Sequence, residues 1–294
     1  MSEISDSGTW HIGVIGGSGL ASGIGLDSAQ EIEVASPFGL PSAAVTTGTL
    51  EGVRFTFLPR HGSGHAVPPS AVNYRANIDV LKRCGVSDVI ALSAIGSLNP
   101  GMAPGHFVAV DQFIDRTTGR ENSFFGPGLV AHVSLADPIC PRLRAGLVSA
   151  VAEDEAKIHD GGCYVAIEGP QFSTRAESKL YRKWGADVIG MTAMPEARLA
   201  REAELPYALL GMVTDYDSWR EGDEADVGEI MAVMKRNVDL AAKVVRAFAR
   251  ALPKARSASP IDHALEHAIM TAPTARDPAL VAKLQAVAGR VLGG

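Results

Sequence analysis

Short apolar runs of strand length alternate with stretches of helical periodicity along most of this chain. The runs expected to form strands lie at residues 10–15, 32–35, 43–47, 53–58, 86–92, 105–110, 162–167, 187–191 and 209–217. Helical spacing is found at residues 72–84, 141–155, 174–184 and 195–204. This alternation predicts an α/β fold, a three-layer α/β sandwich around a mixed, mostly parallel sheet.

The two ends of the chain differ from this pattern. Residues 1–9 read as a flexible polar leader, and residues 10–252 as the main domain, which closes with one long amphipathic helix at 226–251. Ser257–Pro260 has the composition of a turn, and two short helical patterns follow at 260–270 and 277–291. We therefore expect residues 253–294 to form a C-terminal helical extension.

Composition narrows the class of protein. The chain has 294 residues, 46% of them hydrophobic and 20% charged, which is typical of a globular enzyme. Its net charge of −6 argues against nucleic acid and anionic membranes as partners. The three scattered cysteines, together with an N-terminus that lacks the features of a signal peptide, lead us to expect a cytoplasmic protein. No apolar run is long enough for a membrane span.

Two aspartates stand at the end of the last apolar strand. The run 209–213 leads directly into Thr214, Asp215, Tyr216 and Asp217. Because strand side chains alternate between faces, Asp215 and Asp217 are expected to project the same way. An open α/β sheet binds its ligand at the carboxyl ends of its strands. The pair suits a ligand with amino and ring-nitrogen hydrogens.

Three other strand ends carry residues that suit an oxyanion. Gly16–Gly19 follows the first strand and offers backbone N–H groups and the Ser18 hydroxyl, although a plain tight turn explains it equally well. It fails the dinucleotide fingerprint, because Ser22 stands where that pattern needs Gly or Ala. Arg60 offers a fork of donors and His61 a further donor, although such a pair is more often solvated surface. With Ala94 at a third strand end, they suggest a phosphate cup.

Two further strand-end loops bear candidate contacts. Phe172, in the loop before the helix at 174–184, is placed to stack on a flat ring. The same loop contains a capping-box pattern with Glu177. Met191 reads first as core filling, and Thr192 lies where a hydroxyl reaches a phosphate.

The segment His263–His267 matches the H-x-x-E-H zinc signature. We interpret it as an ordinary helix face, because a third ligand is needed, no glutamate follows His267 and the segment lies in the tail.

These motifs together resemble the trimeric purine nucleoside phosphorylase family, and most closely its branch that acts on 5′-methylthioadenosine. The resemblance rests on the runs 16–20, 59–62, 73–77, 164–178, 184–196 and 214–217 and spans roughly residues 10 to 250. It implies a homotrimer that converts 5′-methylthioadenosine and phosphate to adenine and 5-methylthioribose 1-phosphate. It implies no metal or cofactor, since phosphate is a co-substrate.

The resemblance also implies roles for individual residues. Phosphate would be held by Ser18, Arg60, His61, Ala94 and Thr192. The nucleoside would contact Phe172, Met191, Thr214, Asp215 and Asp217, of which the two aspartates would be catalytic. The 5′-methylthio pocket would be formed by Val227, Ile230 and Met231, with His132 reaching into a neighbouring subunit's site.

The chemistry of the aspartates fits such a reaction. The departing purine gains negative charge, and a protonated Asp215 would donate a hydrogen to N7. For Asp215 to be protonated, burial must raise the pKa of its carboxyl. A carboxylate at Asp217 accepts from a 6-amino group and disfavours a 6-oxo group. Three alternatives remain at this point: a phosphorylase for methylthioinosine or other purine nucleosides, a non-catalytic nucleoside sensor, and an NAD-dependent dehydrogenase, which only the glycine turn suggests.

Overall fold

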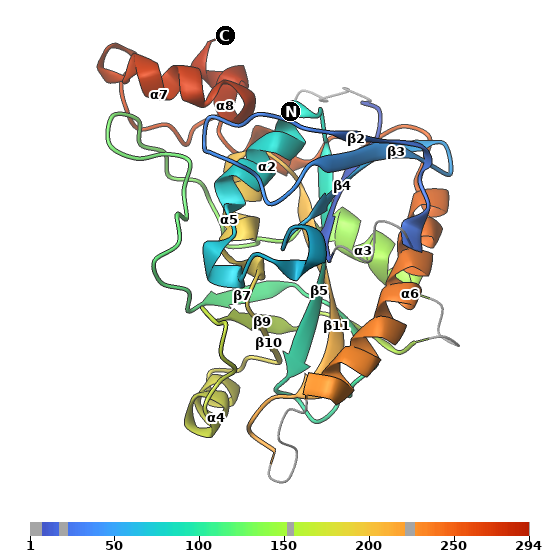
Figure 1. Cartoon of the computed structure of the whole chain (residues 1–294). Helices are drawn as coiled ribbons and strands as arrows, with labels where there is room; N and C mark the ends of the chain where they lie inside the picture. The colour runs from blue at the N-terminus through green and yellow to red at the C-terminus, as the bar shows by residue number, and fades with distance from the viewer. Residues whose placement is uncertain (1–7, 18–22, 152–155, 221–226, 294) are drawn as a thin grey trace.

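The strands form one mixed sheet of 11 strands in the part of the chain that the structure describes (Figure 1). The structure is a computed structural model, and it describes residues 8–17, 23–151, 156–220 and 227–293. The strands are β1 (His11–Gly16), β2 (Asp27–Ile32), β3 (Val45–Leu50), β4 (Val53–Pro59), β5 (Asp88–Ser97), β6 (Phe107–Ala109), β7 (Gln112–Asp115), β8 (Ile158–Asp160), β9 (Cys163–Ala166), β10 (Val188–Gly190) and β11 (Tyr207–Tyr216).

Parallel pairing dominates this sheet. Strands β4, β1, β5 and β11 run parallel to one another in that spatial order. Strands β10, β9 and β7 form a second parallel group, and β10 joins the first group by pairing antiparallel with the end of β5. Antiparallel pairs also occur at β2–β3, β3–β4 and β6–β11. The predicted mixed, mostly parallel sheet is therefore confirmed.

Helices cover both faces of the sheet, as the three-layer prediction requires. Figure 1 shows α2 (Tyr74–Arg83) and α5 (Ala193–Glu202) on one side and α3 (Pro141–Ala150) and α6 (Val227–Ala251) on the other. Helix α4 (Arg175–Lys183) begins with the expected capping box, in which Thr174 and Glu177 bond each other's backbone. None of the helices in the described part is both long enough and apolar enough to cross a membrane.

Short strands account for most differences from the predicted elements. The first hairpin strand lies at Asp27–Ile32 rather than at 32–35. All six of its residues are exposed, so the sequence has no alternation of apolar and polar residues there to indicate a strand. Strands β7 and β8 have four and three residues and were not predicted. Strand β5 continues to Ser97, because its last residues pair with β10 and β11. Such pairing depends on distant strands and leaves no local signal.

The C-terminal segment packs on the same core as the sheet. It contains the 3-10 turns η3 (Pro260–His263) and η4 (Pro273–Ala275) and the helices α7 (Pro278–Lys283) and α8 (Gln285–Leu292). Leu265, Leu284 and Val287 are buried in the main hydrophobic cluster. The helix expected over 260–270 is wrong beyond η3: residues 264–268 form turns, and Ala131 and Ile269 form an isolated bridge.

Candidate functional site

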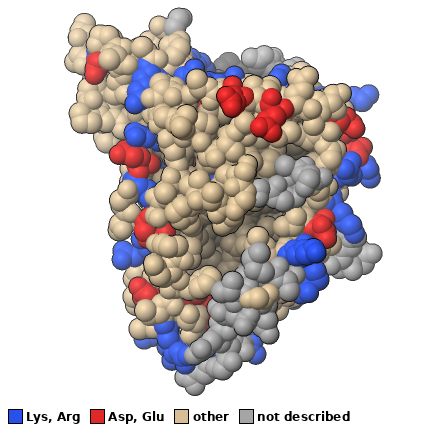
Figure 2. All heavy atoms as spheres, in the orientation of Figure 1, with Lys and Arg blue, Asp and Glu red and all other residues tan. Residues whose placement is uncertain are grey.

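A cavity of about 270 Å³ opens where the carboxyl ends of both parallel groups meet. Its position agrees with the rule that open α/β sheets bind ligands at strand ends. In the space-filling view this face of the molecule is hollowed near the centre (Figure 2). The described residues that line the cavity are Gly17, Arg60, His61, His65, Pro69, Leu92, Ser93, Ala94, Ile95, Gly96, Ile167, Phe172, Ile189, Gly190, Met191, Thr192, Met212, Thr214, Asp215, Asp217, Met234 and Val238.

The two aspartates lie together in the wall formed by the end of β11. The pairing with β5 shifts register between Val213 and Asp215, so Thr214 is the extra residue of a β-bulge. The Thr214 hydroxyl donates to Oδ1 of Asp215 at 2.6 Å. Burial raises the pKa of Asp215, and the neighbouring charge of Asp217 raises it further. The cavity therefore favours the protonated form of Asp215 that donation to a leaving group requires.

Asp217 has an unsatisfied acceptor. Its side chain is 4% exposed, and its Oδ2 atom is buried with no hydrogen-bond partner in the described part of the chain. Burial raises the pKa of this carboxyl as well. A buried acceptor without a partner costs about 1–3 kcal/mol. A ligand that brings an N–H group to this oxygen would recover that free energy.

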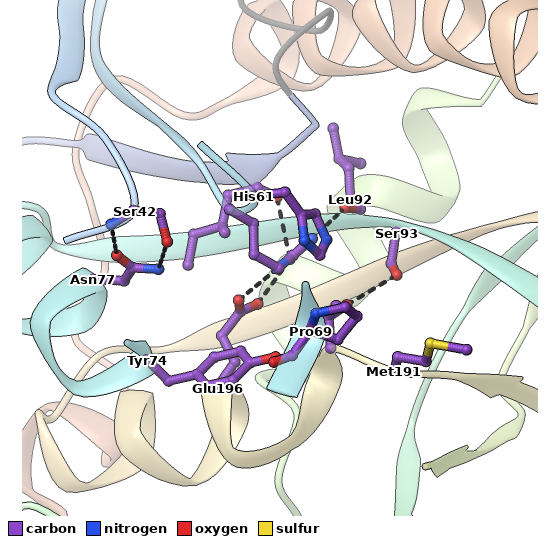
Figure 3. A network of polar contacts seen from close by, with 12 residues as sticks. Ser42, His61, Pro69, Tyr74, Asn77, Leu92, Ser93, Met191 and Glu196 are labelled. Carbon is purple, nitrogen blue, oxygen red and sulfur yellow. Dashed lines mark hydrogen bonds and ion pairs between the residues drawn. The ribbon is translucent and has the colours of Figure 1, made fainter. Parts of the chain in front are cut away.

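Arg60 is buried and already engaged by the protein. Its Nε and Nη2 atoms donate to the two carboxylate oxygens of Glu196 at 2.7 and 2.9 Å (Figure 3). Nη1 donates to the Leu92 carbonyl at 3.1 Å, and Nη2 also lies 3.5 Å from the Ile15 carbonyl. The donor fork that the sequence suggested for phosphate is thus taken by Glu196. Of five N–H groups, one on Nη1 has no partner among the described residues.

His61 adopts one tautomer because of its neighbour. Nδ1 lies 2.9 Å from the carbonyl oxygen of Val67, which can only accept, so Nδ1 carries the hydrogen. Burial, with the adjacent Arg60 charge, lowers the pKa of His61 to about 4. The neutral ring then presents Nε2 as an acceptor. The expectation that His61 adds a second donor is revised: it would accept a hydrogen bond from a protonated phosphate oxygen.

Hydroxyl groups complete this end of the cavity. The hydroxyls of Ser93 and Thr192 lie 3.3 Å apart across the junction of β5 and the turn after β10. Ala94 follows Ser93 on β5 and is exposed to the cavity. Arg60, His61, Ala94 and Thr192, the described members of the predicted phosphate cup, are therefore brought together.

Apolar groups form the remaining walls. Phe172 is 51% exposed at the loop tip, and Met191 faces the cavity beside it. Met234 and Val238, on successive turns of α6, were not among the predicted site residues. Met234 belongs to the same i, i+3, i+4, i+7 stripe as Val227, Ile230 and Met231, and Val238 continues it by one turn.

Some predicted residues are not placed in the cavity. Ser18 lies outside the described residues. Val227, Ile230 and Met231 are at the start of α6, but their side chains are not described. His132 is exposed on a loop, where its backbone N–H donates to the Ala268 carbonyl, and it does not line the cavity of its own chain.

Two charged residues near the cavity, Glu196 and Arg120, were not predicted from the sequence. Glu196 ends the run 184–196, and the sequence predicted no role for it. Arg120 lies in a loop without periodicity, yet it donates to the carbonyls of Glu168, Met191 and Met194 at 2.7–2.8 Å. Because these bonds join segments about 50 and 70 residues away, no local signal identifies them.

The H-x-x-E-H segment does not gather its side chains for a metal. Glu266 pairs with Arg290 at 2.6 Å and lies 4.0 Å from His263. Over the described ranges, no group of three or more His, Cys, Asp or Glu side chains is arranged to hold a metal ion.

The fold agrees with comparisons to known proteins. The model of the phosphorylase superfamily matches residues 11–250, and the chain belongs to that family. It is 55% identical to the S-methyl-5′-thioadenosine phosphorylase of Cereibacter sphaeroides over 96% of this chain and 99% of that protein. It is 54% identical to the enzyme of the same name from Bradyrhizobium diazoefficiens, over 96% and 98% of the two chains.

Solved structures of methylthioadenosine phosphorylases are also similar to this chain. A methylthioadenosine phosphorylase from an Antarctic soil metagenomic library superimposes with a TM-score of 0.87 at 41% identity, covering 95% of this chain and 99% of that one. A variant adenosine/methylthioadenosine phosphorylase from Schistosoma mansoni, in complex with methylthioadenosine, has a TM-score of 0.76 at 35% identity, over 82% and 91% of the two chains.

Proposed function

We propose that this protein is a pentosyltransferase that converts 5′-methylthioadenosine and phosphate to adenine and 5-methylthioribose 1-phosphate, a step of methionine and purine salvage. One observation carries the proposal. A single cavity is lined both by a carboxyl pair, half-buried Asp215 and buried Asp217 with its free acceptor, and by Arg60, His61 and two hydroxyls. Such a lining suits a nucleoside whose base meets the carboxyl pair while phosphate meets the other groups.

Asp215 and Asp217 are the proposed catalytic residues. As the C–N bond breaks, the purine accumulates negative charge, and a protonated Asp215 donates to N7. General acid catalysis of this kind contributes about a hundredfold to ten-thousandfold. Asp217 accepts from the 6-amino group through its free Oδ2. Thr214 orients Asp215, Met191 borders the ribose, and Phe172 packs on the base.

Phosphate attacks the sugar carbon from the other end. Its oxygens are bound by Arg60, Thr192 and the backbone at Ala94, with Ser18 as a further proposed contact. Neutral His61 accepts the hydrogen of monoprotonated phosphate. Donors fixed before the reaction hold the phosphate in position to attack the sugar carbon. Phosphate is thus a co-substrate, and the proposed reaction uses no cofactor.

A homotrimer completes the proposed site. His132 is exposed and outside its own cavity, which is compatible with a role in a neighbouring subunit's site. There it would meet the 5′ pocket formed by Val227, Ile230 and Met231. In this proposal residues 10–252 form the phosphorylase domain, residues 1–9 are a leader, and residues 253–294 are an extension docked on the domain. The enzyme works in the cytoplasm, without nucleic-acid or membrane partners.

A substrate panel tests the proposed reaction. Purified protein is given methylthioadenosine, methylthioinosine, adenosine or inosine, each with and without phosphate, and release of the base is followed by absorbance. We expect methylthioadenosine to have the highest kcat/KM and turnover to require phosphate. Base release that ignores phosphate, or no release at all, would refute phosphorolysis and favour a hydrolase or a sensor. Highest turnover of methylthioinosine would favour the 6-oxo alternative.

Asp215→Asn tests the base-binding end in the same assay. The side-chain amide of the variant can donate to N7, but it cannot act as a carboxylic acid. The ratio of 6-amino to 6-oxo activity should therefore fall about tenfold or more. Asp239→Asn, on the exposed side of α6, is the matched control and should keep the wild-type ratio. An unchanged ratio in the Asp215 variant would argue against the assigned role.

A further inference from the structure

The contact between Arg60 and Glu196 is unusual for a residue expected to bind an anion. Arg60 is 2% exposed and Glu196 1% exposed, and the two share a bidentate ion pair. Away from solvent, such opposite charges are screened little and largely cancel each other. The guanidinium therefore offers the cavity a fixed N–H group but little net positive charge.

Neighbouring groups hold Glu196 in its ionised, oriented form. Its Oε1 atom also accepts from the Tyr207 hydroxyl at 2.9 Å, and Tyr207 is itself buried. Together with Arg60, this gives the carboxylate three hydrogen bonds from two side chains. Glu196 does not line the cavity, so it acts on any ligand only through Arg60.

Arg60 is the only guanidinium or ammonium group among the described lining residues. The remaining ionisable side chains of the cavity are two histidines and two aspartates, and His61 is neutral near pH 7 because its pKa is about 4. Thr192, Ser93 and Ala94 contribute hydroxyl and backbone dipoles without charge. Around the oxyanion, the described permanent cation is therefore Arg60 alone, with its charge offset by Glu196, and the other donors are dipoles and the His61–His65 pair of rings.

We propose that Glu196 is a positioning residue that fixes the Arg60 guanidinium and cancels its charge, so that bound phosphate keeps its own negative charge for the reaction. This inference rests on the proposed phosphorolysis. An oxyanion whose charge is not neutralised binds more weakly in the ground state. It is a stronger nucleophile and stabilises the cationic sugar of the transition state more, and only interactions strengthened in the transition state raise kcat.

Two variants at position 196 separate charge from geometry. Glu196→Gln keeps the shape and removes the charge, while Glu196→Asp keeps the charge and shortens the side chain. The affinity for inorganic phosphate is measured by calorimetry. The values of kcat and of the KM for phosphate are measured by steady-state kinetics at saturating methylthioadenosine. For Glu196→Gln we expect the Kd for phosphate to fall about fivefold or more while kcat falls about tenfold or more. Glu196→Asp should keep a phosphate Kd within about twofold of wild type.

Opposite movement of affinity and rate is the diagnostic result. If Glu196→Gln weakens phosphate binding, or if Glu196→Asp shows the same changes as Glu196→Gln, Glu196 only supports the local structure and the proposal fails. Failure of phosphorolysis itself is seen separately, because the wild-type protein would then release no adenine in a phosphate-dependent way.

Tyr207→Phe provides a second route if Glu196→Gln does not fold. Removing the hydroxyl leaves the carboxylate paired with Arg60 but with one donor fewer, so its charge cancels that of Arg60 more completely. We expect the phosphate Kd to rise about two- to threefold, the opposite sign to Glu196→Gln. A lower or unchanged Kd in this variant would overturn the proposal.

Discussion

A single extra residue decides how the carboxyl pair meets the rest of the cavity. Met212 and Thr214 are two apart on β11 and share a face, and Asp215 and Asp217 would share the opposite one in a regular strand. The bulge at Thr214 changes this alternation, and all four side chains line the same cavity. Simple alternation explains why the aspartates project together. It does not explain why they join Met212 and Thr214.

Gly96 makes room for this arrangement. A Cβ atom there would lie 3.0 Å from Ile189 Cγ2, 3.3 Å from Asp215 Oδ2 and 3.6 Å from Asp217 Cβ. Gly96→Ala should therefore displace the carboxyl pair and lower kcat/KM about tenfold or more, with a small loss of stability. Steady-state kinetics and thermal melting measure the two effects.

Gly126→Ala is the matched control for Gly96→Ala, because a Cβ atom at position 126 has no neighbour within 4 Å. It should leave kcat/KM within about twofold of wild type. Equal activity of both variants would mean that the contact at Gly96 does not set the position of the aspartates.

At the scale of secondary-structure elements, Arg120 ties together the loops that follow β9 and β10. Its side chain is 2% exposed and donates to Glu168 on one loop, to Met191 on the other, and to Met194 at the start of α5. It also donates to the Tyr74 hydroxyl of α2, which in turn donates to the carbonyl of Pro69, a residue of the cavity wall. One guanidinium thus fixes three walls relative to one another.

Arg120→Lys should lower kcat/KM about tenfold and Arg120→Ala about a hundredfold, because a compact ammonium cannot reach the acceptors of a planar fork. Added guanidinium should restore part of the activity of Arg120→Ala, while methylammonium should not. Arg250→Ala, which removes the exposed pair with Glu51, is the control and should keep full activity. Loss of folded protein with unchanged kcat/KM per folded molecule would instead indicate a purely stabilising role.

The C-terminal segment contributes to the larger of the two hydrophobic clusters formed by the described residues. Ile261, Leu265 and Leu284 belong to the same cluster as the central strands. Arg256 reaches from this segment to the buried carboxylate of Asp88 on β5 and also pairs with Asp262. Removal of one partner of a buried pair is costly, so the segment and the sheet are expected to unfold together.

Acid stability is a property of the whole fold, and His11 on β1 is one of its determinants. Its Nε2 atom lies 2.8 Å from the Thr56 hydroxyl of β4, and burial lowers the pKa of His11 to about 4. In the unfolded chain that pKa is about 6.5. Between these values the unfolded state binds a proton that the folded state does not, so the free energy of unfolding falls as the pH drops from about 6.5 to 4.

His11→Gln retains a polar partner for Thr56 and removes this titration. Between pH 7.5 and 4.5, its Tm should fall about 3–5 °C less than that of the wild-type protein, as measured by thermal melting in the absence of ligands. Identical loss of Tm in the two proteins would show that His11 does not contribute to acid destabilisation.

Local sequence determined the elements and the position of the site. Apolar runs at β1, β5 and β11 mark buried strands, because their side chains have no polar face to present, and the polar residues directly after them mark the ligand-binding ends. The capping box at Thr174 and Glu177 was likewise readable, since its two residues are neighbours on the first turn. These features depend on residues close together in the chain.

Only the tertiary structure decided what the charged groups do there. Arg60 and Glu196 are 136 residues apart, and Arg120 contacts segments 46 to 74 residues away. The carbonyl of Val67 keeps the ring hydrogen of His61 on Nδ1. The bulge at Thr214 arises from the pairing of β11 with β5. Burial and partners set charge and protonation, and both come from long-range packing that no local pattern encodes.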